Sequence, residues 1–117
     1  MNNENAVVEK SMNLALRIIE LYNLLCSQRR EYVMSRQILR SGTSIGANVK
    51  EAQCAQTKKD FTAKMYIAFK EASETEYWLE LLYRAKYITV EFYQELWHLN
   101  RELYNLLSAI TKTAKEE

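Results

Sequence analysis

A spacing of alternating three and four residues between apolar side chains recurs in each quarter of this chain. Because this period is close to 3.5 residues, each run keeps one side of an α-helix facing its neighbours, whereas a strand alternates every second residue. The pattern therefore predicts four amphipathic helices packed at shallow angles, and it excludes a β-sheet. The predicted seams are Val8, Met12, Ala15, Ile19, Tyr22, Cys26; Ile38, Gly42, Ile45, Val49, Ala52; Phe61, Met65, Ala68, Ala72, Thr75, Leu79, Leu82; and Phe92, Leu96, Leu99, Leu103, Leu106, Ile110.

The breaks between the seams carry signals for helix starts. Thr57 is followed by Asp60 and Thr89 by Glu91, which places a hydroxyl cap and a carboxylate at the positive end of a helix. The sequence has no proline and only two glycines, which favours long helices. We expect the helices near residues 5–27, 34–54, 58–85 and 90–114.

Short connections between these helices force neighbours to run antiparallel. We therefore predict an all-α fold, an antiparallel up-down-up-down four-helix bundle, with the sense of its turn left open. A chain of 117 residues fits one domain that spans residues 1–117 and buries one core without disulfides.

Neither a secretory signal peptide nor an apolar run long enough to span a bilayer is visible in the sequence. Cys26 and Cys54 have no CxxC spacing and no neighbouring histidine, so they suit a reducing compartment and offer no metal site. We expect a cytoplasmic protein without a membrane partner, in which both cysteines are buried in helices as apolar residues.

The apolar residues outside the seams exceed what one bundle can hide. Outside its seam, the first helix also carries Leu14, Leu16, Ile18, Leu21 and Leu25, and the last two helices carry many further aromatic side chains. Large exposed apolar patches usually mark interfaces, so we predict a homo-oligomer. The alternative is that the tyrosines lie on the surface with their hydroxyls in water. The candidate interface residues are Tyr66, Tyr77, Trp78, Trp97 and Tyr104.

Basic and acidic residues are unevenly distributed although the net charge is only +1. Residues 27–70 hold nine basic and three acidic side chains, whereas residues 71–117 hold five basic and nine acidic ones. The basic part could neutralise RNA phosphates or face the acidic part of another subunit, and a plain solvated surface is the alternative. The candidate nucleic-acid-binding residues are Arg29, Arg30, Arg36, Arg40, Lys58 and Lys59.

No motif for catalysis or for a cofactor emerges from the sequence. Glu95 and His98 have the Glu-x-x-His spacing of di-iron bundles, but such a site needs two of these motifs and His98 is the only histidine. A single histidine also leaves no nucleophilic triad. We therefore predict a protein that is not an enzyme, with no metal, no cofactor and no evident small-molecule substrate, and with His98 facing solvent.

Ser44, Asn48 and Glu51 form a polar stripe, because their spacing of four and three places them on one side of the second helix. The stripe either meets the third helix near Glu71, Thr75 or Glu76, or it is plain surface. Gly42 and Gly46, four residues apart, let another backbone approach the neighbouring strip of the same helix.

Residues 37–82 resemble the family of 23S rRNA intervening-sequence proteins. The resemblance rests on four segments, and with the flanking helices it covers nearly the whole chain. The core Ser-Ile-x-Ala-Asn-x-x-Glu is fairly specific, since helix propensity alone asks for neither serine nor asparagine. The segments are residues 37–41 (QILRS), 44–52 (SIGANVKEA), 59–61 (KDF) and 68–82 (AFKEASETEYWLELL).

This resemblance implies a bundle that assembles into a ring, a pentamer, and a similar fold serves as the nucleic-acid-engaging accessory protein of diversity-generating retroelements. Many family members have proline at the position of Gly46 and glycine at that of Ala52, and the strong positive charge of the retroelement protein is absent here. We expect an oligomeric scaffold that contacts RNA or an RNA-handling protein through its basic residues, or a purely structural assembly. The positions that match the family's characteristic sites are Arg40, Ser44, Asn48, Glu51 and Glu76.

Overall fold

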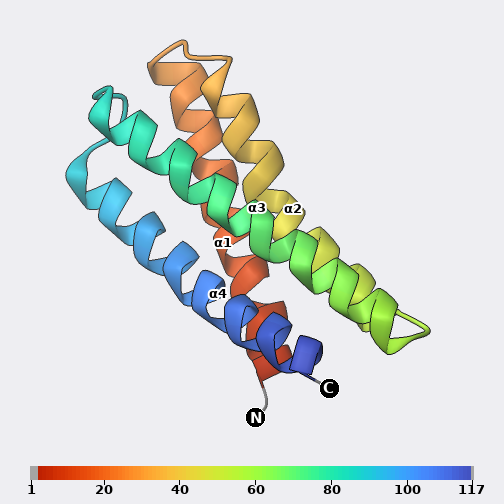
Figure 1. Cartoon of the computed structure of the whole chain (residues 1–117). Coiled ribbons are helices and arrows are strands. Elements are labelled where there is room, and N and C mark those ends of the chain that lie inside the picture. The colour runs from red at the N-terminus through yellow and green to blue at the C-terminus, as the bar shows by residue number, and fades with distance from the viewer. Residues whose placement is uncertain (1–2, 117) are drawn as a thin grey trace.

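The structure, a computed structural model, describes residues 3–116 and contains four α-helices and, within those residues, no strand (Figure 1). The limits of all four helices lie within two residues of the predicted ones, and the predicted all-α class is confirmed. The helices are α1 (Asn3–Gln28), α2 (Met34–Gln53), α3 (Lys58–Arg84) and α4 (Val90–Glu116).

The helices form a bundle of four corners that measures 46 × 21 × 21 Å. The helix α1 packs on α2 and α4, and α3 packs on the same two helices, so α1 and α3 occupy diagonal corners. Short loops join successive helices, which run antiparallel as predicted (Figure 1). Both ends of the chain lie at the end of the bundle that also holds the α2–α3 loop (Figure 1).

Threonine hydroxyls start the last two helices, as the sequence predicted. The hydroxyl of Thr57 accepts a hydrogen bond of 3.0 Å from the amide of Asp60 at the start of α3. The hydroxyl of Thr89 accepts one of 3.2 Å from the amide of Phe92 at the start of α4. Each bond satisfies one of the amides that the first turn of a helix leaves without a partner.

A buried carboxylate starts α2 in place of a hydroxyl. The side chain of Glu31 accepts hydrogen bonds from the amides of Val33 and Met34 at 3.1 Å and of Ser35 at 2.8 Å. The hydroxyl of Ser35 donates in turn to the carbonyl of Glu31 at 2.8 Å. This cap was not predicted, because Glu31 precedes the helix by three residues and does not stand at the usual capping position.

The core confirms the predicted seams of α2 and α3 and corrects that of α1. The seams of α2 and α3 are buried apart from Phe61, which is half-buried. In α1 the seam is shifted by one residue, and three members of the predicted seam are exposed: Val8 by 39%, Met12 by 62% and Ile19 by 41%. The residues of α1 that enter the core are Val7, Ser11, Leu14, Ile18, Leu21 and Leu25.

In α4 the predicted seam is correct at Leu96 and Leu103, which are fully buried. Like Phe92, the residues Leu99, Leu106 and Ile110 are only half-buried. Their expected places in the core are taken by Asn100, Leu107 and Thr111. Within residues 3–116, none of the helices combines the length and the apolar character that crossing a bilayer requires.

Candidate subunit interface

Neighbouring helices meet along four outer edges of the bundle, and ion pairs cross the α2–α3 edge. The guanidinium of Arg40 bonds to the carboxylates of Glu71 and Glu74. The hydrogen bond that the indole of Trp78 donates to Glu74, together with the contact to Arg40, holds the pKa of the Glu74 carboxyl below its ordinary value. The next ion pair along this edge joins Lys64 and Glu51 at 3.0 Å.

Two ion pairs cross the α1–α4 edge. The ammonium of Lys10 lies 2.9 Å from the carboxylate of Glu102. The guanidinium of Arg17 donates two hydrogen bonds of 2.7 Å to Glu95 and lies 4.9 Å from the centre of the Phe92 ring. The hydrogen bonds from Arg17 lower the pKa of the Glu95 carboxyl.

A mixed aromatic and charged cluster covers the α3–α4 edge. The guanidinium of Arg101 bonds to Glu76 and lies over the rings of Tyr104, at 4.4 Å, and Trp97, at 5.2 Å. Such cation–π contacts use aromatic surface that would otherwise face water. Trp97 and Tyr104 are accordingly half-buried by their own chain.

The α1–α2 edge differs from the other three, because within residues 3–116 no ion pair crosses it. At this edge α1 packs against two glycines of α2, Gly42 and Gly46. A Cβ at Gly42 would lie 2.9 Å from Cγ1 of Ile18, and one at Gly46 would lie 3.3 Å from Oγ of Ser11. Gly42 therefore makes room for the Ile18 side chain, and the predicted approach of another backbone is found at Gly46, where a Cβ would lie 3.7 Å from the carbonyl of Ser11.

The outer face of this edge is apolar and uncovered. We call it the α1–α2 groove; it has a volume of about 390 Å³ and its lining contains no carboxylate. The neighbouring surface of α1 continues the apolar character with Leu16, 53% exposed, and Ile19, 41% exposed. The main lining residues of the groove are Val8, Met12, Ala15, Thr43, Ala47 and Lys50.

The aromatic residues that were predicted from the sequence to form an interface differ in their exposure. Trp78, Trp97 and Tyr104 are half-buried in contacts within the chain. Tyr66 and Tyr77 remain exposed, by 41% and 58%, on the outer side of α3. Of the exposed aliphatic residues of α1, Leu16 belongs to the predicted surplus, whereas Val8, Met12 and Ile19 were missed because they had been assigned to the core seam.

The polar stripe of α2 makes mostly local contacts. The hydroxyl of Ser44 donates to the carbonyl of Arg40, and the amide of Asn48 donates to the carbonyl of Ser44 at 2.9 Å. Glu51 does reach α3, but at Lys64 rather than near Glu71. Of the two alternatives for the stripe, the meeting with α3 near Glu71 does not hold for Ser44 and Asn48, whose side chains bond to their own helix.

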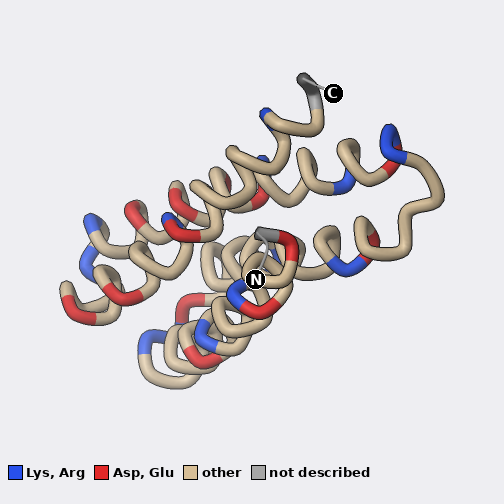
Figure 2. Tube along the Cα trace, turned by 90° about the horizontal axis from the view of Figure 1, so that it is seen from below, with Lys and Arg blue, Asp and Glu red and all other residues tan. Residues whose placement is uncertain are grey.

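The basic candidates do not form one patch. Lys58 and Lys59 begin α3, whereas Arg29 and Arg30 lie in the loop at the opposite end of the bundle, and Figure 2 shows basic positions at both ends. The guanidinium of Arg29 donates to the carbonyls of Lys86 and Tyr87, at 3.1 and 3.2 Å. This contact brings the α1–α2 and α3–α4 loops side by side.

Two further candidates, Arg36 and Arg40, lie in the first two turns of α2. Arg36 is exposed and, within residues 3–116, makes no ion pair, whereas Arg40 is engaged by Glu71 and Glu74. The structure therefore leaves Arg30 and Arg36 as the accessible basic residues at this end and adds Lys86, which the sequence analysis missed.

The cysteines and the histidine correct one prediction and confirm another. Cys54 is exposed just after α2, so its predicted burial is wrong, and Cys26 is half-buried with its sulfur 3.8 Å from Oγ of Ser35. His98 is exposed as predicted and packs edge-on against Trp97. In the described part of the chain, no three His, Cys, Asp or Glu side chains converge on a point where they could hold a metal ion.

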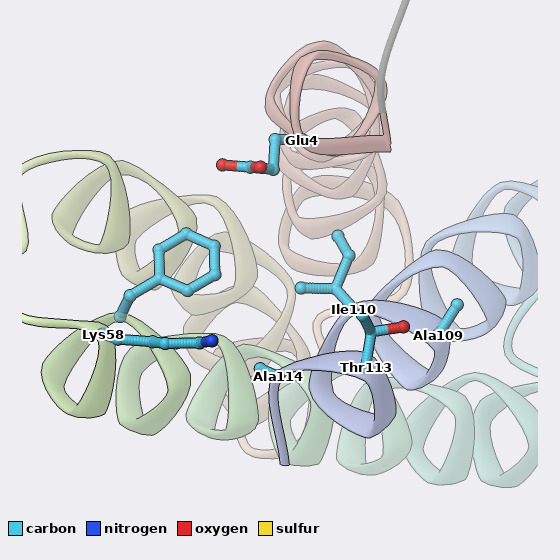
Figure 3. Close-up of a pocket in the computed structure, with 7 residues that line it drawn as sticks. Glu4, Lys58, Ala109, Ile110, Thr113 and Ala114 are labelled. Atoms are coloured by element: carbon cyan, nitrogen blue, oxygen red, sulfur yellow. The ribbon is translucent and has the colours of Figure 1, made fainter. Parts of the chain in front are cut away.

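A second hollow lies where the starts of α1 and α3 and the end of α4 diverge (Figure 3). It has a volume of about 210 Å³, and Phe61, Ile110 and Ala114 give it an apolar wall. Its charged groups are Glu4 and Lys58, and no nucleophile and base approach each other in it. The α1–α2 groove is larger and more apolar, and it is the better candidate for a functional surface.

The fold defines a small all-helical protein of the four-helix-bundle class, with an apolar groove between α1 and α2. The chain belongs to the family of 23S rRNA-intervening sequence proteins, whose family model matches residues 3–109. A crystal structure of a protein with unknown function from the S23 ribosomal protein family of Bacteroides thetaiotaomicron VPI-5482 is similar to it, with 52% sequence identity and a TM-score of 0.93. The match covers 95% of this chain and 99% of that one. A search of curated proteins gave no match.

Proposed function

We propose that the chain is a non-catalytic assembly module that associates with further copies of itself through the α1–α2 groove. The observation that carries this proposal is the contrast between the four outer edges of the bundle. Ion pairs cross three of them, whereas within residues 3–116 the α1–α2 edge has none and its face is aliphatic. Charged side chains keep a surface in water, and Lys50 is the one that lines this groove, so the largely apolar lining favours a face that is covered in the working protein.

The size of the apolar stripe supports this proposal. Val8, Met12, Leu16 and Ile19 are each about half exposed. Complete burial of such a side chain is worth about 1.5–3 kcal/mol relative to full exposure. Covering the exposed half of all four side chains therefore contributes roughly 3–6 kcal/mol to the free energy of association. A stable complex at micromolar concentration needs about 8 kcal/mol, so the other residues of the contact must contribute the rest. The family resemblance implies five subunits.

Light scattering of the full chain tests the proposal. The expected mass exceeds the 13.8 kDa of one chain at micromolar concentration, and a pentamer would have five times that mass. Met12→Glu combined with Leu16→Glu should lower the mass to that of one chain while the helical circular dichroism is retained, because both side chains are exposed. The matched control is Gln94→Glu with Asn105→Glu, two exposed positions of α4. A wild-type mass of 13.8 kDa would overturn the proposal.

A second candidate function is contact with RNA at the end of the bundle that holds the α1–α2 loop. The observation that favours it is the bond from Arg29 to the α3–α4 loop, which gathers Arg30, Arg36 and Lys86 at this end. The ring of Tyr32, 50% exposed, lies in the same loop. Cations there could neutralise phosphates while an exposed ring stacks on a base. Assembly would place several such ends together and strengthen a weak contact.

Retention of RNA at several salt concentrations tests this second candidate. Affinity should fall steeply as salt rises, because phosphate neutralisation releases counterions. Arg30→Gln with Arg36→Gln should flatten that dependence, whereas the control Lys58→Gln with Lys59→Gln, at the other end, should leave it unchanged. Binding that is absent at low salt, or equally affected by both pairs of substitutions, would exclude this site.

A further inference from the structure

We infer that the α1–α2 groove of one copy receives the outer side of α3 from a second copy, so that two different surfaces meet. This inference rests on the proposed self-association and specifies its geometry. We call the second surface the α3 ridge; its exposed apolar members are Tyr66, Ile67 and Tyr77, by 41%, 41% and 58%. The partner is therefore a second copy of this chain, which binds through a different face.

The positions of the two surfaces favour an unlike pairing. Because α1 and α3 occupy diagonal corners, the groove and the ridge face away from each other on one bundle. A two-fold contact of groove with groove would leave Ile67 and Tyr77 uncovered on both copies. A contact of groove with ridge covers both apolar surfaces, and it uses each of them once per subunit.

The groove and the ridge also match in length and shape. Ile67 and Tyr77 are ten residues apart, about 15 Å along a helix, and Val8 and Ile19 are eleven apart, about 16 Å. Small residues line part of the groove, with Ala15 on α1 and Gly46 and Ala47 on α2, beside the larger Val8 and Met12. The small residues therefore leave room in the groove for the large rings of the ridge.

One charged contact between the two surfaces favours the unlike pairing. Lys50 is exposed at the rim of the groove and, among residues 3–116, makes no ion pair, and the groove has no carboxylate. On the ridge, Glu74 and Glu80 beside Tyr77 are already paired with Arg40 and Arg84, and Lys70 is exposed 6.0 Å from the ring of Tyr66. Asp60, seven residues before Ile67, is exposed and makes no ion pair in the described part of the chain. The ammonium of Lys50 can therefore meet Asp60 when the Ile67 end of the ridge lies toward it, whereas groove against groove would offer it only another lysine.

A contact between unlike surfaces leaves one groove and one ridge unused at the ends of any open chain of subunits. Such contacts either close into a ring or continue as a filament, depending on the rotation between neighbours. The geometry therefore predicts an assembly in which every subunit has two neighbours. It does not predict an isolated two-fold dimer.

Two damaged variants test this pairing when they are mixed. The groove variant combines Met12→Glu and Leu16→Glu, and the ridge variant combines Ile67→Glu and Tyr77→Glu; all four positions are exposed. Each variant alone should have the mass of one chain, since either damage blocks every contact. In an equimolar mixture the intact ridge of the first can enter the intact groove of the second. The mixture should then show a 1:1 dimer with twice the mass of either variant, measured at high micromolar concentration because no ring can close.

The outcomes separate this inference from the proposed function. A wild-type chain that is monomeric would overturn both. A wild-type assembly with a ridge variant that assembles normally would overturn the inference alone, because the ridge would then lie outside the contact. A mixture that stays monomeric would also overturn it, since the intact groove of one variant would then fail to bind the intact ridge of the other. Unchanged helical circular dichroism and urea unfolding of both variants serve as the control for folding.

Discussion

The hydroxyls of Ser41 and Thr75 lie 2.9 Å apart in the core and share a hydrogen bond between α2 and α3. Both side chains are fully buried. Thr75→Val keeps the shape of the side chain but leaves the Ser41 hydroxyl with only the carbonyl of Ile38, at 3.5 Å. We expect the free energy of unfolding to fall by about 1–2 kcal/mol, because a buried hydroxyl without a good partner is costly.

A double-mutant cycle measures this bond. Ser41→Ala together with Thr75→Val removes both hydroxyls, so the double variant should lose less stability in urea unfolding than the two single losses combined. Strictly additive losses would show that the two hydroxyls are not coupled.

Gly42→Ala should destabilise the bundle by about 1–3 kcal/mol through overpacking. The added Cβ would lie 2.9 Å from Cγ1 of Ile18 and 3.3 Å from its Cβ. Rotation of a β-branched side chain cannot clear both contacts, so the helices must separate. Gly46→Ala is the control, because its nearest contact is the smaller Ser11 at 3.3 Å and the gain in helix propensity of about 1 kcal/mol opposes the crowding. Equal effects of the two substitutions in urea unfolding would contradict this account.

Glu31→Ala should cost about 1–2 kcal/mol, which is the usual effect of losing a side-chain cap. Its carboxylate satisfies three amides at the start of α2, from Val33 to Ser35, and it is 9% exposed. Thermal unfolding checks the loss, with the exposed Glu9→Ala on α1 as the control. A loss no larger than that of the control would mean that water replaces the cap without cost.

Stability should decline on acidification through Glu95. Because hydrogen bonds from Arg17 lower the pKa of this carboxyl in the folded chain, the ion pair stabilises the fold above the ordinary value of 4.5. That contribution is lost as the pH falls through the lowered pKa. It should amount to at most about 1 kcal/mol, since solvent screens an exposed pair.

Urea unfolding at neutral pH and below pH 4.5 measures this effect. Glu95→Gln should reduce the difference in stability between the two conditions, whereas Glu91→Gln, an exposed neighbour outside any ion pair of the described residues, should not. An unchanged pH dependence in Glu95→Gln would show that the pair contributes nothing.

The candidate site was only partly predictable because contacts across the bundle determine which charges are available. Nothing in the local sequence of Arg40 distinguishes it from Arg36, yet Glu71 and Glu74 engage only the former. Lys86 joins Arg29 across 57 residues of sequence, and no spacing rule anticipates that contact. The exposure of Tyr66 and Tyr77 agrees with an interface on α3, but the uncovered face of α1 emerges only from the packed bundle.

The sequence by itself determined four helices, their limits to within two residues, their caps at Thr57 and Thr89, and their antiparallel order. These features follow from local spacing and from short loops, which act along the chain. The tertiary structure alone decided which side of α1 is buried. Apolar residues occupy two adjacent stripes of that helix, one through Val8 and Met12 and one through Leu14 and Ile18, so periodicity cannot rank them. The close approach of Gly42 to Ile18 selects the second stripe for the core and leaves the first in water.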